Sequence, residues 1–198
     1  MLLWIKGALS PEMIRTRLLD PESSFQQKMI AYLDDCHQGH FENSSLSETL
    51  DRVRVKSNQK HYLKPTQILP TAPPLDGPVE AKANWWSTMQ HETNDILLRA
   101  NVHNCDSRCK LKGTEKCKSR FPRPITEATH VDETGYVTVR HDEPMLNTIN
   151  PMMTFLLRCN TDVTSLLTGT SLKAVIAYTT DYITKVGLKT PTMFDLIR

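Results

Sequence analysis

Two tyrosines one helical turn apart, Tyr178 and Tyr182, have side chains that could attack phosphate esters. The apolar residues around them recur with a helical period, which predicts an amphipathic helix over residues 171–186. This spacing places both phenols on one flank of the helix, with Lys185 about one turn further on. A phenol has a pKa of about 10, so a nearby cation would favour nucleophilic attack at neutral pH. The pair has the chemistry to attack two DNA phosphates in turn and hold each product covalently.

The same spacing also occurs in tyrosines that have no catalytic role. Tyrosine is amphipathic and often rims a hydrophobic core with its hydroxyl in water. A pair of tyrosines on one helix is therefore more often structural than catalytic. The catalytic interpretation depends on the rest of the chain.

A second group of reactive side chains lies in the middle of the sequence. His103, Cys105, Cys109 and Cys117 bring three thiols and one imidazole into a short segment. This donor set can complete a tetrahedral zinc shell, and a shell closed by four protein ligands is structural rather than catalytic. A loop of unligated cysteines is the alternative. The metal site is favoured because the loop is too polar to fold by burying apolar surface.

The same segment is strongly basic. Seven cations and one glutamate give residues 108–123 a net charge of +6, whereas the whole chain carries +2. The cations are Arg108, Lys110, Lys112, Lys116, Lys118, Arg120 and Arg123. Together with Phe121, on which a base could stack, they predict contacts to nucleic-acid phosphates. A charge run can also be no more than a solvated face.

The length and composition restrict the class of protein. A chain of 198 residues suffices for one sizeable domain, or for a domain with a small module. No stretch has the pattern of a signal peptide or the apolar length of a membrane helix. Five cysteines, three of them clustered, favour reduced thiols in an intracellular, non-secreted protein.

Capping and patterning signals divide the chain into elements. Residues 1–35 should form a first strand over 2–5 and two helices, which Ser10-Pro11 and Asp20-Pro21 begin. Residues 36–78 read as a polar and proline-rich linker, in which His37 and His40 are incidental. A helix follows over 79–102, with Trp85 and Trp86 more suited to packing than to base stacking.

The remaining residues follow the basic Cys/His loop, which spans 103–124. Residues 125–130 and 136–141 flank a turn in which Gly135 would supply a positive φ, and they predict a hairpin. Two further short strands are expected over 154–160 and 163–167. The tyrosine helix comes next, and a last helix begins at Pro191. Residues 125–198 would thus complete one domain with residues 1–35.

Three stretches resemble the replication-initiator region of Helitron transposases, in particular the fungal Helitron helicase-like proteins. They are Met1-Leu-Leu-Trp-Ile-Lys-Gly-Ala8, the loop ending in Cys117-Lys-Ser-Arg-Phe-Pro122, and Lys173-Ala-Val-Ile-Ala-Tyr-Thr-Thr-Asp-Tyr-Ile-Thr-Lys185. They occur in the family's order and span about two-thirds of the chain. The resemblance implies an α+β fold, a mainly antiparallel sheet flanked by helices. The basic Cys/His loop over 103–124, called the zinc loop below, would be an insertion in this fold.

The resemblance also implies an activity. Such proteins are rolling-circle nucleases of the histidine–hydrophobic–histidine (HUH) class, in which a His-x-His pair binds Mg²⁺ or Mn²⁺. A tyrosine cuts single-stranded DNA, and two tyrosines allow strand transfer. Carried onto this chain, the nucleophiles are Tyr178 and Tyr182, with Lys185 beside them. A nuclear location and a helicase region as partner are further implications.

This sequence departs from the family in one respect. It contains no His-x-His, and Met1 lies directly on the strand that such a motif would precede. Without these ligands the metal that stabilises the transition state has no site. We therefore expect a transposase fragment or decayed copy that is inactive alone. The helicase region of such transposases is also missing from this sequence. The alternatives are a non-enzymatic zinc-loop module that binds nucleic acid, and a purely structural domain.

Overall fold

The structure, a computed structural model, describes residues 7, 9–20, 23–111, 113–165, 173, 175–177 and 179–180. These residues fall into two compact units. Unit 1 combines the chain up to Gln26 with residues 131–136 and the described residues from Ser165 onward. Unit 2 consists of residues 27–130 and 137–164. Among the described residues, no helix has the length and apolar character to cross a membrane.

Unit 1 contains α1 (Pro11–Leu18), which begins as the sequence predicts. The Ser10 hydroxyl accepts a hydrogen bond from the backbone N–H of Met13, and Pro11 occupies the first helical position. The turn over residues 131–136 packs on this helix. Gly135 has a φ of +78°, and a Cβ atom there would lie 2.8 Å from Cγ of Arg15. The predicted glycine turn is therefore confirmed, and its close approach to α1 also requires glycine.

The second helix, α2 (Ser24–Cys36), begins later than Asp20-Pro21 suggested. Pro21 and Glu22 lie outside the described residues. Leu33 is buried, and Phe25, Met29 and Ile30 are half-buried at the helical spacing seen in the sequence.

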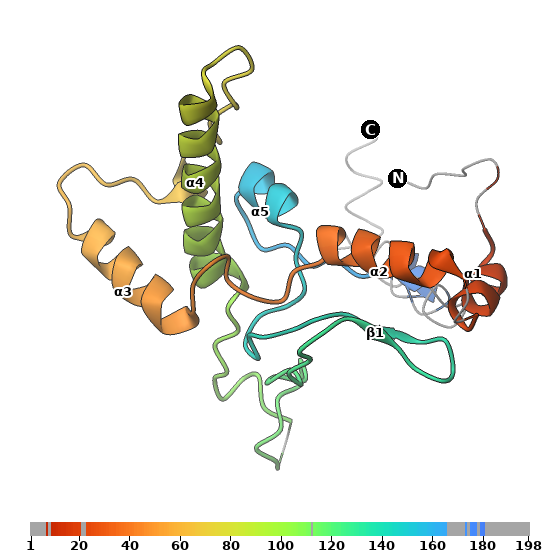
Figure 1. Ribbon diagram of the computed structural model, residues 1–198. Coiled ribbons are helices and arrows are strands. Elements are labelled where there is room, and N and C mark those ends of the chain that lie inside the picture. Colours follow the sequence, from red (N-terminus) through yellow and green to blue (C-terminus); the bar gives the residue numbers. More distant parts are fainter. Residues whose placement is uncertain are drawn as a thin grey trace, which may run out of the picture. The chain divides into compact units, whose positions relative to one another are not determined.

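Unit 2 is built around α4 (Val79–Ile96), which continues as a π-helical turn, η2 (Leu97–Asn101). The helices α3 (Leu46–Ser57) and α5 (Pro151–Leu157) both pack against α4, as does the short 3-10 helix η1 (Pro65–Gln67) (Figure 1). A buried apolar cluster lies at the end of α4 and consists of Phe41, Leu97, Leu146 and Ile149. The predicted helix over 79–102 is confirmed, and this cluster fixes the end from which the basic loop departs.

Polar contacts supplement this small core. The side chain of Asn94 accepts from the backbone N–H of Glu42 and donates to its carbonyl, at 2.9 and 2.8 Å. The guanidinium of Arg158 is buried, lies 2.6 Å from a carboxylate oxygen of Glu92 and packs over the ring of Phe155. These contacts tie α4 to the segments before α3 and after α5.

The sheet is much smaller than expected. The described residues contain one two-stranded antiparallel sheet, formed by β1 (His130–Val131) and β2 (Val137–Thr138). An isolated bridge between Thr126 and His141 extends this hairpin, so the predicted pairing of 125–130 with 136–141 is confirmed. The described part of the chain is thus a mixture of helices with a small antiparallel sheet.

Two predictions about elements are wrong. Residues 154–157, expected in a strand, belong to α5, because Asn150 caps the helix, Pro151 begins it and Arg158 ends it at a φ of +55°. Residues 36–78, expected as a linker, contain α3, whose Ser45 and Glu48 form a capping box. The proline-rich part, 64–78, has only the single 3-10 turn η1.

The predicted tyrosine helix is described only in part. Residues 173, 175–177 and 179–180 are helical, as expected. Val175 and Ile176, which the sequence placed on a packed face, are 39% and 54% exposed. Tyr178, Tyr182 and Lys185 lie outside the described residues, as do the predicted strand over 2–5 and the helix expected at Pro191.

Candidate metal centre and nucleic-acid interface

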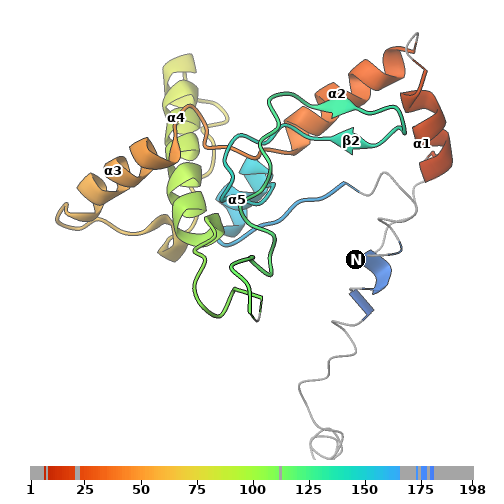
Figure 2. The ribbon, with the colours of Figure 1, turned by 90° about the horizontal axis from the view of Figure 1, so that it is seen from below.

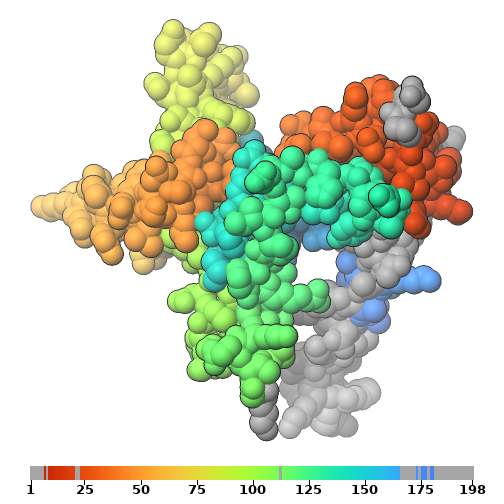
Figure 3. Space-filling model, turned by 60° about the horizontal axis from the view of Figure 1, so that its bottom comes forward, coloured from red at the N-terminus to blue at the C-terminus, as the bar shows by residue number. Residues whose placement is uncertain are grey.

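The Cys/His loop leaves unit 2 directly after the π-helical turn. The backbone N–H of His103 donates to the carbonyl of Met145, which holds the start of the loop on the rest of the unit. Further on, an antiparallel bridge joins Lys110 to Cys117, and the N–H of Lys118 donates to the carbonyl of Cys109 at 2.7 Å. This folded-back segment stands out from the helices in the space-filling view (Figure 3).

The fold-back brings the four predicted metal ligands together. The donor atoms of His103, Cys105, Cys109 and Cys117 all lie within 4.8 Å of one another. Nε2 of His103 is 3.3 Å from Sγ of Cys109 and from Sγ of Cys117, and these two sulfurs are 3.3 Å apart. The cysteines are free, because a disulfide would need sulfurs about 2.05 Å apart.

These distances suit a tetrahedral zinc ion. Bond lengths of about 2.3 Å to sulfur and 2.0 Å to nitrogen place tetrahedral donors roughly 3.5–3.8 Å apart. The three separations among His103, Cys109 and Cys117 are slightly shorter, and the distances from Cys105 to the other donors are within 4.8 Å, so a small adjustment of the loop would admit the ion. The residues therefore fit a closed four-ligand site, in which the metal would be structural and would fix the loop.

Hydrogen bonds favour the thiolate form of one candidate ligand, Cys117. Burial raises the pKa of Cys117, but backbone N–H groups of Phe121 and Ser119 and the thiols of Cys109 and Cys105 outweigh it and lower the pKa to about 6. Burial and the neighbouring sulfurs raise the pKa of Cys105 to about 11. Such N–H donors to a thiolate are typical of structural metal sites, where they orient the ligand.

The imidazole of His103 is held by an aromatic stack. Its ring lies parallel to that of Phe121, with the centroids 4.2 Å apart and an interplanar angle of 9°. The guanidinium of Arg123 packs against the same phenyl ring, 4.6 Å from its centroid, and donates to the side chain of Asn147. Phe121 thus contacts both a candidate metal ligand and an arginine. The sequence assigned it only to base stacking.

Several of the predicted DNA-contacting cations have partners within the loop. Arg108 pairs with Asp106 at 2.6 Å, and Lys110 pairs with Glu115. The ammonium of Lys118 donates to the carbonyl of Arg108. These contacts stiffen the loop and neutralise part of its charge.

Two cations of the basic loop are available to contact phosphates. Among the described residues, no hydrogen bond or ion pair engages the side chains of Lys116 and Arg120, and both are exposed. Arg120 is held at a φ of +61°. Lys112 lies outside the described residues. The free positive charge is therefore next to Cys117, the ligand with the lowered pKa.

A hollow of about 600 Å³ opens beside this end of the loop. Its lining joins the loop to residues far along the chain: His103, Lys118, Ser119, Arg120, Phe121, Arg123, Asn147, Asn160 and Asp162. In Figure 2 the blue chain that follows α5 passes the start of the green loop. Asn147, Asn160 and Asp162 were not expected here, since no local pattern links them to the cysteines.

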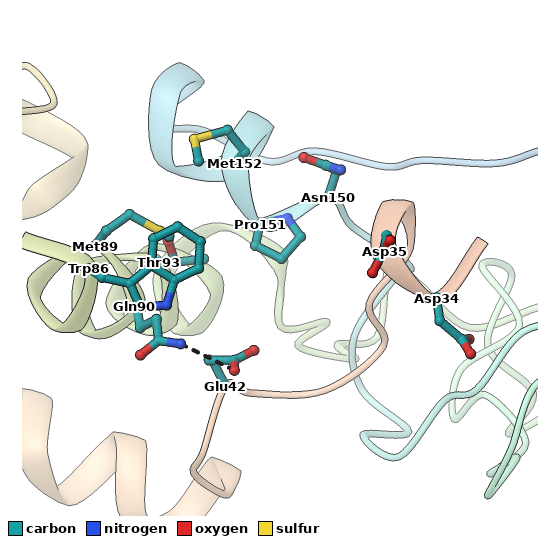
Figure 4. A pocket seen from close by; sticks show the side chains of 10 residues that line it. All are labelled: Asp34, Asp35, Glu42, Trp86, Met89, Gln90, Thr93, Asn150, Pro151 and Met152. Atoms are coloured by element: carbon teal, nitrogen blue, oxygen red, sulfur yellow. Dashed lines mark hydrogen bonds between the residues drawn. The ribbon is translucent and has the colours of Figure 1, made fainter. Parts of the chain in front are cut away.

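A different hollow, of about 370 Å³, lies between α4, α5 and the end of α2 (Figure 4). Trp86, Met89 and Met152 form its apolar part, and Asp34, Asp35 and Glu42 add carboxylates. The neighbouring Trp85 instead meets Phe155 edge-on and donates from its indole to the carbonyl of Thr71. The prediction that the tryptophans serve packing thus holds for Trp85, whereas Trp86 is half exposed.

The histidines of the predicted linker have no shared site. His37 is buried, and its Nδ1 lies 3.0 Å from the carbonyl of Leu33. Gly39 packs against the ring of His141, where a Cβ atom would lie 2.2 Å from Nδ1. The segment is therefore a packed part of unit 2. Within the described part of the chain, the His103 cluster is the one group of three or more such ligands close enough to share an ion.

No protein-family model matches the chain, and neither curated proteins nor solved structures give a match. The arguments about the site therefore rest on its own residues and geometry.

Proposed function

We propose that this chain is the strand-binding part of a Helitron-type transposase, and that a zinc-fixed basic loop grips single-stranded DNA. In this proposal Tyr178 and Tyr182 are the nucleophiles, assisted by Lys185. A nuclear location and cooperation with a helicase region belong to the same proposal. The observation that carries it is the convergence of four zinc-type donors beside the unpaired cations Lys116 and Arg120.

The gathered ligands explain how a polar loop can present charge to DNA. Cys117 is the one buried residue among the described residues of 103–123, so without a metal the burial of apolar surface does little to fix the shape of the loop. With zinc bound, the four ligands close the loop, and Phe121 connects His103 to Arg123. Fixed cations lose less conformational entropy on binding phosphates than mobile ones do.

The family's Mg²⁺ or Mn²⁺ site does not fit the residues of this chain. The sequence contains no His-x-His, and the described residues offer no second cluster of ligands. No step of strand cleavage is therefore assigned to the chain alone. This favours a second candidate function, a non-enzymatic module that binds nucleic acid through the zinc loop.

The binding function is tested by the salt dependence of affinity. Each phosphate contact to a single strand contributes about −0.7 to the slope of log K against log salt concentration. We expect the double variant Lys116→Gln/Arg120→Gln to bind a fluorescent deoxythymidine oligomer more weakly. Its slope should be less steep by about 1.4, measured by anisotropy from about 50 to 200 mM salt.

The matched control is Lys60→Gln/Lys64→Gln. Both lysines are exposed, and the pair removes the same charge elsewhere in unit 2. It should leave the slope nearly unchanged. Equal losses in the two double variants would mean that general charge, rather than the zinc loop, attracts DNA.

A further inference from the structure

The hollow beside the zinc loop contains one residue whose charge opposes DNA binding. Among its described lining residues, Asp162 is the only acidic one, and Lys118, Arg120 and Arg123 are cationic. A carboxylate in a phosphate-binding groove repels the backbone. An acidic residue in a basic groove therefore indicates a role other than binding phosphates. A carboxylate in a nucleic-acid site can accept hydrogen bonds from the donor groups of a base.

The oxygens of Asp162 are available for such a bond. No hydrogen bond or ion pair engages the side chains of Asp162 and Asn160 among the described residues, and both side chains are exposed. Both line the hollow. Arg123, by contrast, is held by Asn147 and by the ring of Phe121.

The backbone between these two residues is firmly held. Thr161 is buried, and its hydroxyl lies 2.6 Å from that of Thr154 in α5. The side chain of Asn101 donates to the carbonyl of Thr161 at 2.6 Å, and the N–H of Val163 donates to the carbonyl of Thr148. With Thr161 anchored in the core, Asn160 and Asp162 are presented from a fixed backbone, which is the arrangement a selective site requires.

We infer that this hollow reads a guanine base of the bound strand, a specificity that rests on the proposed binding of single-stranded DNA. Guanine is the DNA base whose Watson–Crick edge has two adjacent donors, N1–H and the 2-amino group, which a carboxylate accepts together. Asp162 accepts these two hydrogens, and the Asn160 amide donates to O6. Arg120, whose side chain has no partner among the described residues, holds a flanking phosphate.

The other bases fit this arrangement poorly. Adenine and cytosine each place a ring-nitrogen acceptor beside their amino group. This nitrogen would face a carboxylate oxygen, and two acceptors repel each other because neither supplies a hydrogen. Thymine has one donor between two carbonyl oxygens. A well-formed bidentate pair discriminates by about tenfold or more against the wrong base.

The test compares short deoxythymidine oligomers that carry one central guanine, hypoxanthine, adenine or cytosine. Anisotropy should show about tenfold tighter binding for guanine than for adenine. Hypoxanthine, which lacks the 2-amino group, should be intermediate. Asp162→Asn should remove the preference yet bind plain deoxythymidine oligomers at least as tightly, because repulsion of phosphates is relieved. A misfolded variant would lose that binding as well.

Two controls separate the possible failures. Asp76→Asn makes the same charge change at an exposed loop position and should keep the preference for guanine. Equal affinity for all four oligomers would overturn the guanine assignment while leaving DNA binding intact. Absence of binding to every oligomer would overturn the proposed function and this inference with it. Displacement of the guanine oligomer by an equimolar amount of free deoxyguanosine monophosphate would overturn the assignment to a strand.

Discussion

Among individual residues, we expect the candidate metal site to be most sensitive to substitution at Cys117. Cys117 is the buried donor of the cluster, and N–H groups of Phe121 and Ser119 stabilise its thiolate. Loss of an N–H partner of a ligand alone typically lowers metal affinity 10–100-fold. Loss of the sulfur itself removes a bond and also leaves these donors facing a weaker acceptor.

Replacing Cys117 with serine should therefore abolish stoichiometric zinc. We expect Cys117→Ser to lower zinc affinity by more than about 100-fold and to weaken DNA binding through loss of the fixed loop. Elemental analysis of protein purified without chelator, with competition against a colorimetric chelator, measures this. Cys159→Ser is the matched control, since this thiol is exposed and outside the cluster. Equal zinc content in the two variants would refute the assigned ligands.

At this scale the sequence predicts well which donors come together, and predicts their surroundings poorly. Residue type and spacing point to His103, Cys105, Cys109 and Cys117, because side chains within one short loop are close by necessity. Nothing local places residues 160 and 162 beside the loop, since that contact joins segments about 40 residues apart. The sequence assigns Phe121 to stacking on a base, whereas its stacking on His103 appears only once the loop is folded.

Among the elements, α3 shows how a helix can be hidden in a polar sequence. Only Thr49 and Val53 are buried in it, so its apolar pattern is too sparse to recognise as a helix face. The local signal is Ser45 followed by Glu48, a capping box in which each side chain accepts from the other's backbone N–H. In α5 the local signal is Asn150, whose side chain accepts from the backbone N–H of Met153, followed by Pro151 at the first helical position.

The capping box gives a prediction of stability. Ser45→Ala removes the hydroxyl that accepts from the N–H of Glu48, and should lower the free energy of unfolding by about 1 kcal/mol. Urea denaturation followed by circular dichroism measures the change. The control is Ser87→Ala on the exposed face of α4, which should be neutral or slightly stabilising because alanine favours helix interiors. Equal destabilisation by both variants would show that the cap contributes nothing.

For the whole molecule, order along the chain does not define the compact units. The hairpin turn over 131–136 joins α1 in unit 1, although residues on both sides of it belong to unit 2. The sequence placed boundaries at a proline-rich linker, yet residues 36–78 lie within unit 2. Composition marks where a chain is extended, whereas the units are set by contacts between distant residues. Long-range contacts of this kind have no local signature.

The catalytic hypothesis also belongs to the whole molecule, because it needs groups that this sequence does not contain. In the presence of Mn²⁺ we expect the chain alone to form no covalent adduct with a single-stranded oligomer, since nothing fixes the metal that would polarise the phosphate. A version with an added His-x-His strand ahead of Met1 should form an adduct that survives denaturing electrophoresis. Tyr178→Phe/Tyr182→Phe should abolish that adduct, and Tyr136→Phe, at an exposed hairpin position, should retain it. An adduct that persists in the double variant would show that another residue is the nucleophile, and the basic zinc loop would then be left as a binding module without chemistry of its own.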